Sequence, residues 1–293
     1  MPVSAAVVLM AYGSPETADD IRPYLEDIRE GRPVSARAVA ELTERYRRIG
    51  GRSPLVEITE RQRAALEAEL ELPVFVGMKH WRPRIAEAAE RALAVGADTI
   101  VGLVLAPHYS ALSIGGYRDR LEGALSGRAD LLVVESWHDH GPFLDVLADR
   151  VRGTDAHVIF TAHSLPARIR ASGDPYEDQL LETARLVAER AGLRDWSFAF
   201  QSASETGEPW LGPDILDELE SLAGRGVRKV LVCPVGFVSD HLEILWDLDV
   251  EAREKAAALE LGLARIPSLN DDPAFIAALA GLVRQTLAVR SGA

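Results

Sequence analysis

Short apolar runs that end at turn residues alternate with segments of helical period along the whole chain. The helical segments include 58–71, 84–97, 176–192 and 215–226. Continuous apolar strands between amphipathic helices are typical of parallel sheets that helices cover on both faces. Eight runs are predicted to be strands: AAVVLMAYGSP (5–15), PVFVGMK (73–79), TIVGLVLAPH (99–108), DLLVVESW (130–137), HVIFTAHSLP (157–166), WSFAFQSAS (196–204), KVLVCPVGF (229–237) and LGLARIPSL (261–269).

The two halves of the chain carry a faint internal repeat. VVLMAYGSP resembles VIFTAHSLP, and LVLAPH in the first half is echoed by LVCPVGF in the second. Strand composition alone would also produce such similarity. We predict an α/β fold of two similar Rossmann-like domains, 1–150 and 151–293. The helix at 275–290 is expected to pack back across one of the two halves, and the N-terminal half is one option. Ligands bind beyond the carboxyl ends of parallel strands, so we expect the active-site cleft between the domains.

The stretch HLEILWDLDVE, residues 241–251, combines many apolar residues with many carboxylates. At roughly 100° per residue, Asp240, Glu243, Asp247 and Glu251 fall within roughly 80° of one another, whereas Asp249 points the opposite way. Apolar residues occupy the remaining circumference, so no separate polar face exposes these acids to water. Like charges at this spacing repel, and a buried unpaired carboxylate is costly. The stripe therefore predicts a cation, a proton relay or an arginine partner.

Composition and charge exclude several classes of protein. No apolar run reaches 18 residues and no basic-then-apolar leader is visible, so we expect a cytoplasmic protein without membrane insertion. The formal charge of −13 argues against nucleic acid as a partner. The single cysteine, Cys233, excludes a disulfide framework and an iron–sulfur cluster that needs several thiolates from this chain. We predict that Cys233 is a small core residue.

Basic residues are concentrated in one stretch, 22–52. It holds eight arginines against five acids, so it carries +3 while the rest of the chain sums to −16. Such a local excess would attract an anionic ligand. An arginine-rich helix that is simply solvated and paired with its i,i+4 acids explains the same pattern, and the sequence does not separate the two interpretations.

Candidate catalytic groups lie where predicted strands end. His163 comes directly after the apolar run VIFTA (158–162) of a predicted strand segment. A cleft shared with Glu243 would suit a divalent metal such as iron or zinc, or proton transfer. His108 and His241 also lie next to strand ends and are expected to line the same cleft in supporting roles. The signatures G-x-x-x-x-G-K-[ST], G-x-G-x-x-G, G-x-S-x-G and H-E-x-x-H are missing, so nucleotide, hydride and serine-hydrolase chemistries lose their usual support.

Nine segments in order along nearly the whole chain resemble ferrochelatase. The tyrosine in AYG, the length of the chain and the lack of a membrane-binding segment make the resemblance strongest to the coproporphyrin III type of Gram-positive bacteria and their relatives. The segments are MAYGSP (10–15), RYRRIGGRSPL (45–55), GMKH (77–80), LAPHYS (105–110), FTAHSLP (160–166), GDPY (173–176), QS (201–202), PWLGPD (209–214) and PVGFVSDHLEILWDLDVE (234–251).

This resemblance implies insertion of Fe²⁺ into coproporphyrin III, as a step of haem biosynthesis, between two chelatase-type domains. It implies that His163 and Glu243 face the macrocycle as metal ligands and acceptors of pyrrole protons, and that Tyr12 lies near the opposite face and ligates iron in the product. Asp247 and Glu251 would extend a path for protons or metal outward. Substrate contacts, chiefly to propionates, are implied for Tyr12 and for Arg29, Arg45, Tyr46, Ser53 and Tyr117.

One position departs from the family pattern, because Glu30 stands where many relatives carry a second arginine. We expect the porphyrin and Fe²⁺ as substrates, no cofactor beyond Fe²⁺, no iron–sulfur cluster, a monomer, and at most transient contacts with other enzymes of the haem pathway. Three alternatives stay open: a protoporphyrin IX ferrochelatase, a cobalt or nickel chelatase for a reduced tetrapyrrole, and a carrier that binds haem or porphyrin without inserting metal.

Overall fold

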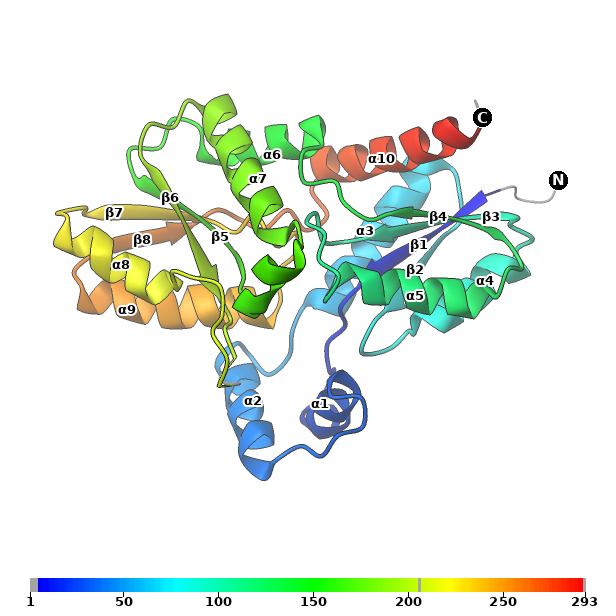
Figure 1. Cartoon of the computed structure of the whole chain (residues 1–293), viewed down its shortest axis with the longest axis horizontal. Helices are drawn as coiled ribbons and strands as arrows, with labels where there is room; N and C mark the ends of the chain where they lie inside the picture. The colour runs from blue at the N-terminus through cyan, green and yellow to red at the C-terminus, as the bar shows by residue number, and fades with distance from the viewer. Residues whose placement is uncertain (1–4, 205–206, 292–293) are drawn as a thin grey trace.

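The computed structural model describes residues 5–204 and 207–291 and contains two parallel sheets. The first sheet has the order β2-β1-β3-β4 and the second has the order β6-β5-β7-β8 (Figure 1). The two orders are the same when the strands are counted within each half, so the predicted pair of similar α/β domains is confirmed. Each predicted strand segment contains a strand: β1 (Ala5–Ala11), β2 (Val74–Met78), β3 (Thr99–Val104), β4 (Asp130–Val134), β5 (His157–His163), β6 (Trp196–Gln201), β7 (Lys229–Cys233) and β8 (Gly262–Arg265).

Helices cover both faces of each sheet. Figure 1 shows α6 and α7 above the second sheet and α8 and α9 below it, whereas α10 lies above the first sheet. The α-helices are α1 (Ile21–Ile28), α2 (Ala36–Arg48), α3 (Leu55–Leu70), α4 (Ile85–Ala94), α5 (Ile114–Leu125), α6 (Gly141–Val151), α7 (Tyr176–Ala191), α8 (Ile215–Gly224), α9 (Arg253–Ala258) and α10 (Pro273–Ser291). Short 3₁₀ turns span Ala18–Asp20 and Ala167–Ser172.

The strands are apolar on both faces because each face packs on different helices. In β1, Val7 and Leu9 belong to the core cluster that includes α3 and α10, whereas Val8 and Met10 pack with α4 and α5. Successive side chains of a strand point to opposite faces, so a strand buried on both sides shows no polar alternation. The same arrangement holds in the second sheet, where Phe160 packs with α6 and α7 while its neighbour Ile159 packs with α8 and α9.

Helix α10 joins the two halves through a single core cluster. Phe275 and Leu279 of α10 belong to the same cluster as Val7 of β1 and Phe160 of β5. The helix packs against α3, α6, β3 and β4. Helix α6 spans residue 150 and packs chiefly against α7 of the second half, and the domain boundary at residue 150 stays a prediction.

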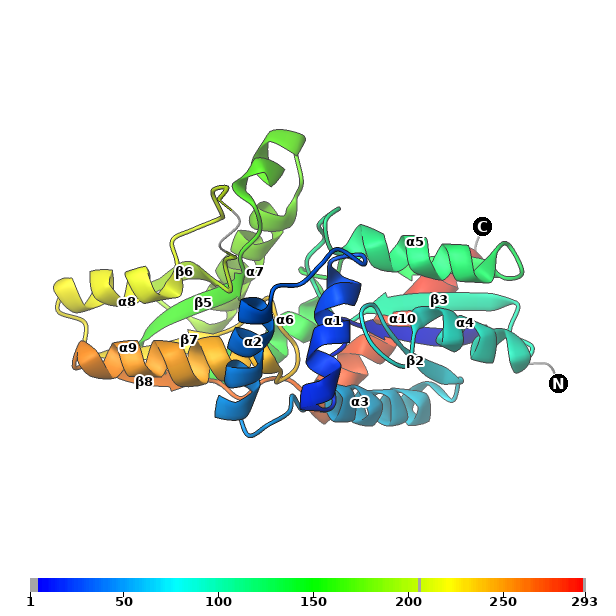
Figure 2. The ribbon, with the colours of Figure 1, turned by 90° about the horizontal axis from the view of Figure 1, so that it is seen from below.

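Helices α1 and α2 form an arm below the two sheets. Figure 2 shows the arm between the two domains, with α2 on the side of the second domain. Arg45 and Arg48 of α2 lie over the Trp246 ring, with guanidinium carbons 5.7 and 5.4 Å from its centroid, and Arg48 also forms an ion pair with Glu254. The arginine-rich stretch of the first half therefore contacts the second domain through α2.

The acidic segment after β7 is a π-helix, Ile244–Ala252, rather than the α-helix that we assumed. A π-helix closes i→i+5 hydrogen bonds and rotates by less than 100° per residue. In an α-helix, two residues four positions apart are offset by roughly 40° around the axis. In a π-helix this offset is smaller, so such residues lie more nearly above one another. Glu243, Asp247 and Glu251 keep a common side under this geometry. Within the described residues no helix is both long enough and apolar enough to cross a bilayer.

Candidate functional site

A cavity of about 740 Å³ opens where the carboxyl ends of both sheets meet. Its lining includes Tyr12 after β1, Lys79 after β2, His108 after β3, His163 at the end of β5 and Glu243 beyond β7. Parallel strands place their carboxyl ends at one edge of a sheet, and ligands bind in the crevice beyond that edge. The expected position of the cleft between the domains agrees with this cavity, and both His108 and His241 line it as expected.

His163 and Glu243 form the central polar pair of the cavity. His163 Nε2 lies 3.5 Å from Glu243 Oε1, and about a third of each side chain is exposed, 32% and 33% respectively. His163 Nδ1 is in close contact with the carbonyl oxygen of Ser164, and the Trp210 ring lies 6.5 Å away between centroids. The predicted convergence of this imidazole and this carboxylate is therefore present in the structure.

Glu243 lies between two imidazoles. His241 Nε2 is 3.8 Å from Glu243 Oε2, while His241 Nδ1 is 2.9 Å from the carbonyl oxygen of Ser239. Burial alone would raise the pKa of Glu243, but the charge of His163 and the hydrogen bond from His241 hold that pKa at about 2. The same carboxylate raises the pKa of His241 against the effect of burial. Glu243 is thus an anion throughout the neutral range, suited to a divalent cation.

Tyr12 is the polar group of the cavity nearest the end of β1. It is 42% exposed, and its ring lies 4.7 Å from the His80 ring between centroids. Loss of water around the phenol and the Glu243 charge raise the pKa of Tyr12, so the phenol is protonated at neutral pH. His80 Nδ1 lies 3.0 Å from Asp27 Oδ2, and burial lowers the pKa of His80 to about 4. A neutral imidazole beside Tyr12 can hold the phenol in place without adding charge.

Asp247 lies one turn beyond Glu243 and is nearly buried, at 6% exposure. Ser202 Oγ donates to Asp247 Oδ2, and Gln201 Nε2 is 3.4 Å from the same oxygen and 3.1 Å from the Glu243 carbonyl oxygen. Burial and the negative charges of Glu243 and Glu251 raise the pKa of Asp247 to about 7. Asp247 can therefore bind and release a proton at neutral pH. Neither Asp247 nor Glu251 lines the cavity among the residues described.

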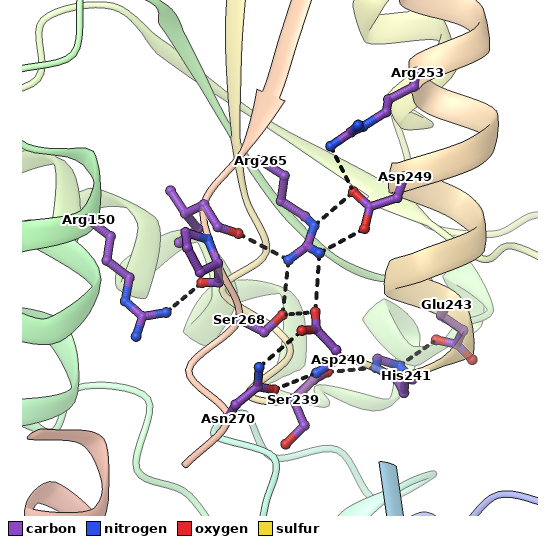
Figure 3. Close-up of polar contacts among 12 residues, drawn as sticks. Arg150, Ser239, Asp240, His241, Glu243, Asp249, Arg253, Arg265, Ser268 and Asn270 are labelled. Atoms are coloured by element: carbon purple, nitrogen blue, oxygen red, sulfur yellow. Dashed lines mark hydrogen bonds and ion pairs between the residues drawn. The ribbon is translucent and has the colours of Figure 1, made fainter. Parts of the chain in front are cut away.

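Asp240 does not belong to this carboxylate stripe, which corrects the sequence prediction. Figure 3 shows Asp240 turned toward Arg265, which lies at the end of β8. Arg265 Nη2 is 3.2 Å from Asp240 Oδ1 and 2.8 Å from Asp249 Oδ2, and Ser268 and Asn270 donate to Asp240 at 2.7 and 3.0 Å. Asp240 precedes the helix, so helical angles do not describe it. The arginine partner is thus found for Asp240 and Asp249, and only Glu243, Asp247 and Glu251 remain in the stripe.

The predicted substrate-binding residues divide into two groups. Tyr46, Ser53 and Tyr117 line the cavity, and the Tyr46 hydroxyl lies 3.1 Å from Ser14 Oγ. Arg29 and Arg45 do not line it among the described residues, and Arg45 lies over Trp246 instead. In the basic stretch, five arginines have carboxylate partners: Arg22, Arg37, Arg47, Arg48 and Arg52. Only Arg22 and Arg37 have the i,i+4 partners of the solvated-helix interpretation, whereas Arg48 pairs with Glu254 of the second half.

Four charged residues of the cavity lining had no site role assigned from the sequence. They are Glu30, Lys79, Asp119 and Arg120. Arg120 Nη1 donates to the carbonyl oxygen of Lys79. Lys79 lies in the GMKH segment directly after β2, and its place at a strand end was the available signal. Arg120 lies three residues after Tyr117 on α5 and shares one side of that helix with it.

The ferrochelatase family model matches residues 4–287 of this chain. A ferrochelatase of Herpetosiphon aurantiacus is 44% identical over 295 residues, which cover 94% of this chain and 97% of that protein. A ferrochelatase of Deinococcus radiodurans is 44% identical over 305 residues, with 96% of each chain covered. The coproporphyrin III ferrochelatase of Geobacillus kaustophilus is 40% identical over 300 residues and covers 96% of this chain and 95% of its own.

Solved structures of other chelatases share the fold. The structure of SirB from Bacillus subtilis with Fe³⁺ superposes with a TM-score of 0.63 at 12% identity, covering 99% of this chain and 98% of that one. The structure of CbiX, described as the terminal enzyme of sirohaem biosynthesis in denitrifying bacteria, gives 0.53 at 13% identity, with 96% and 98% covered. At these identities the likeness concerns the fold alone. The match of the family model and of relatives along nearly the whole sequence shows that this chain belongs to the ferrochelatase family.

Proposed function

We propose that this chain inserts Fe²⁺ into coproporphyrin III and releases the iron porphyrin. The observation that carries the proposal is the His163–Glu243 pair, 3.5 Å apart on the wall of a cavity of about 740 Å³. Imidazole and carboxylate are suitable ligands for a divalent metal of intermediate hardness. Relatives at about 40% identity that carry the name coproporphyrin III ferrochelatase support the choice of porphyrin.

The side chains around the cavity match the separate tasks of metal insertion. Glu243, ionised because its pKa is about 2, attracts Fe²⁺ into the cavity together with His163. Two pyrrole protons must leave the porphyrin, and His163 accepts protons on the side of the second domain. Asp247, with a pKa of about 7, passes protons toward Glu251 along the stripe. Tyr12 lies at the end of the opposite sheet and ligates iron in the product.

The periphery of coproporphyrin suits the hydroxyls on the cavity wall and the arginines on the arm. That porphyrin carries four propionates, and charge-assisted hydrogen bonds are the strong contacts for carboxylates. Tyr46, Ser53 and Tyr117 supply hydroxyls on the cavity wall. Arg29 and Arg45 lie on the arm below it, where they meet propionates that project from the cavity. Binding energy gained at the periphery helps to hold the ring in the bent geometry that exposes its nitrogen lone pairs.

The direct test is anaerobic incubation of the protein with Fe²⁺ and either coproporphyrin III or protoporphyrin IX, followed by loss of porphyrin fluorescence. We expect a higher kcat/KM for coproporphyrin III. A higher value for protoporphyrin IX would replace the proposed substrate while keeping the reaction. Preference for cobalt or nickel and a reduced tetrapyrrole in competition would favour a different chelatase. Tight porphyrin binding without insertion of any metal would favour a carrier.

Variants at the central pair test the assignment of residues. His163→Ala and Glu243→Ala should each abolish insertion while leaving porphyrin binding largely intact, because the ring is held by the walls and periphery. His138→Ala is a matched control, since this histidine pairs with Glu182 and lies outside the cavity lining among described residues. Unchanged insertion rates in the His163 or Glu243 variant would contradict the assigned roles.

We further propose a cytoplasmic monomer that needs no cofactor beyond its substrate Fe²⁺ and carries no iron–sulfur cluster. The single cysteine supports the last point, because Cys233 is buried in β7 and its pKa is raised by burial. Sedimentation of the purified protein and its iron and sulfide content after anaerobic purification would test these statements. Transient contacts with other enzymes of the haem pathway stay a prediction.

A further inference from the structure

Lys79 is held inside the cavity by the first domain. Only 9% of the residue is exposed, and it lines the cavity directly after β2. Lys79 Nζ donates to the carbonyl oxygen of Ser113 at 3.0 Å and lies 4.9 Å from the centroid of the Tyr117 ring. A methyl group built on Gly116 would come within 3.0 Å of Nζ. The absence of a side chain at Gly116 therefore leaves room for the ammonium group.

The ammonium group of Lys79 retains unused hydrogen-bonding capacity. An ammonium has three donors, and the described residues supply one acceptor, the oxygen of Ser113. Over residues 5–204 and 207–291, neither Lys79 nor Arg120 forms an ion pair with an acid of the chain. Glu30 also lines the cavity and acts on Lys79 only through longer-range attraction. A nearly buried cation without a carboxylate partner is costly unless a ligand supplies one.

Arg120 extends this positive region to the edge of the cavity. It lines the cavity from α5, and its Nη1 holds the backbone oxygen of Lys79. Burial and the charge of Arg120 lower the pKa of Lys79 to about 8. An arriving anion would relieve both effects at once, because it replaces lost hydration and offsets the neighbouring positive charge. The two cations thus favour a negatively charged group between them and Tyr117.

We propose that Lys79, with Arg120 beside it, binds a peripheral carboxylate of the porphyrin at the wall formed by β2 and α5. This anchor rests on the proposed function and adds to it a binding site in the first domain, away from Arg29 and Arg45 on the arm.

Equilibrium binding of metal-free porphyrin tests the anchor without relying on catalysis. We expect Lys79→Gln to raise the Kd for coproporphyrin III by about 10-fold, the range of a lost hydrogen bond between charged groups. Lys79→Arg should stay within about 3-fold of the unmodified protein, since it keeps the charge and the donors. Lys229→Gln is the matched control, because Lys229 is exposed at the start of β7 and pairs with Asp155. In iron insertion, Lys79→Gln should raise KM for porphyrin with little change in kcat.

A second ligand separates charge recognition from packing. The tetramethyl ester of coproporphyrin III, presented in detergent, has the same ring without the carboxylates, so Lys79→Gln should leave its affinity unchanged. Equal loss of affinity for acid and ester, or no loss for the acid, would overturn the anchor. Failure of the unmodified protein to bind coproporphyrin III would instead contradict the proposed function. If Lys79→Gln does not fold, Arg120→Gln at the exposed edge provides the same comparison of acid with ester.

Discussion

Replacement of Asp247 by asparagine should stabilise the protein at neutral and alkaline pH. Asp247 is 6% exposed, and burial together with the charges of Glu243 and Glu251 raises its pKa to about 7. The native state therefore carries a carboxylate in a place that disfavours its charge. Asparagine keeps an oxygen that accepts from Ser202 and Gln201 and removes the repulsion.

The sign and size of the effect follow from linkage between folding and protonation. Between the ordinary pKa of 3.8 and the native value of about 7, the native state holds a proton that the unfolded state has lost. The contribution of Asp247 protonation to the free energy of unfolding is therefore fully present below about pH 4. It is lost progressively as the pH rises from about 4 to about 7. At about 1.36 kcal/mol for each pKa unit, the loss amounts to roughly 4 kcal/mol. The weaker hydrogen bond from Ser202 to a neutral amide reduces the gain in Asp247→Asn to about 2–4 kcal/mol above pH 7.

Urea unfolding of both proteins at pH 5, 6.5 and 8 measures this difference. We expect the variant's advantage in the free energy of unfolding to grow across the series. Asp249→Asn is the matched control two residues away, because Asp249 pairs with Arg265 at 2.8 Å, and its replacement should lower stability. A difference between Asp247→Asn and the unmodified protein that is zero or constant with pH would refute the reasoning. Slower iron insertion by Asp247→Asn would accompany the gain in stability if the residue passes protons.

Two further substitutions and one labelling experiment test other parts of the structure. Tyr12→Phe should change the visible spectrum of bound product haem, and an identical spectrum would contradict axial ligation. Arg265→Gln removes the cation that Asp240 and Asp249 share, leaving Asp249 only Arg253 at 3.6 Å (Figure 3). It should lower the free energy of unfolding by about 3 kcal/mol in urea titration; unchanged stability would show that the shared pairing contributes nothing. Cys233 is buried and burial raises its pKa, so a thiol reagent should label it only at the rate of unfolding; fast labelling of the native protein would contradict that burial.

The strands and the two-domain plan could be predicted because they depend on short-range pattern. Continuous apolar runs such as β1 and β5 signal burial on both faces, and the structure covers them as predicted. The position of His163 followed from the rule that ligands bind at the carboxyl ends of parallel strands. The convergence of His163 with Glu243 was a hypothesis whose geometry depends on how the segment after β7 returns to the cavity.

The remaining features depend on contacts between distant residues or on local geometry that the pattern did not reveal. Asp240 lay in the stripe only under the assumption of an α-helix, and its partner Arg265 lies 25 positions later at the end of β8. The π-helix has no signature in the apolar spacing. Lys79 did not stand out in the charge pattern, because the arginines of 22–52 dominate it. In the structure Lys79 lines the cavity from the end of β2.

The position of α10 has a consequence for how the chain matures during synthesis. The upper face of the first sheet, including Val7 and Leu9, is sealed in part by Phe275 and Leu279. Synthesis proceeds from the N-terminus, and domains generally fold as they emerge. Here the first domain leaves the ribosome with an apolar face still open to solvent, and that face closes only after α10, far downstream in the sequence, has been made. A ribosome-bound chain that lacks residues 273–291 would therefore present a natural target for chaperones.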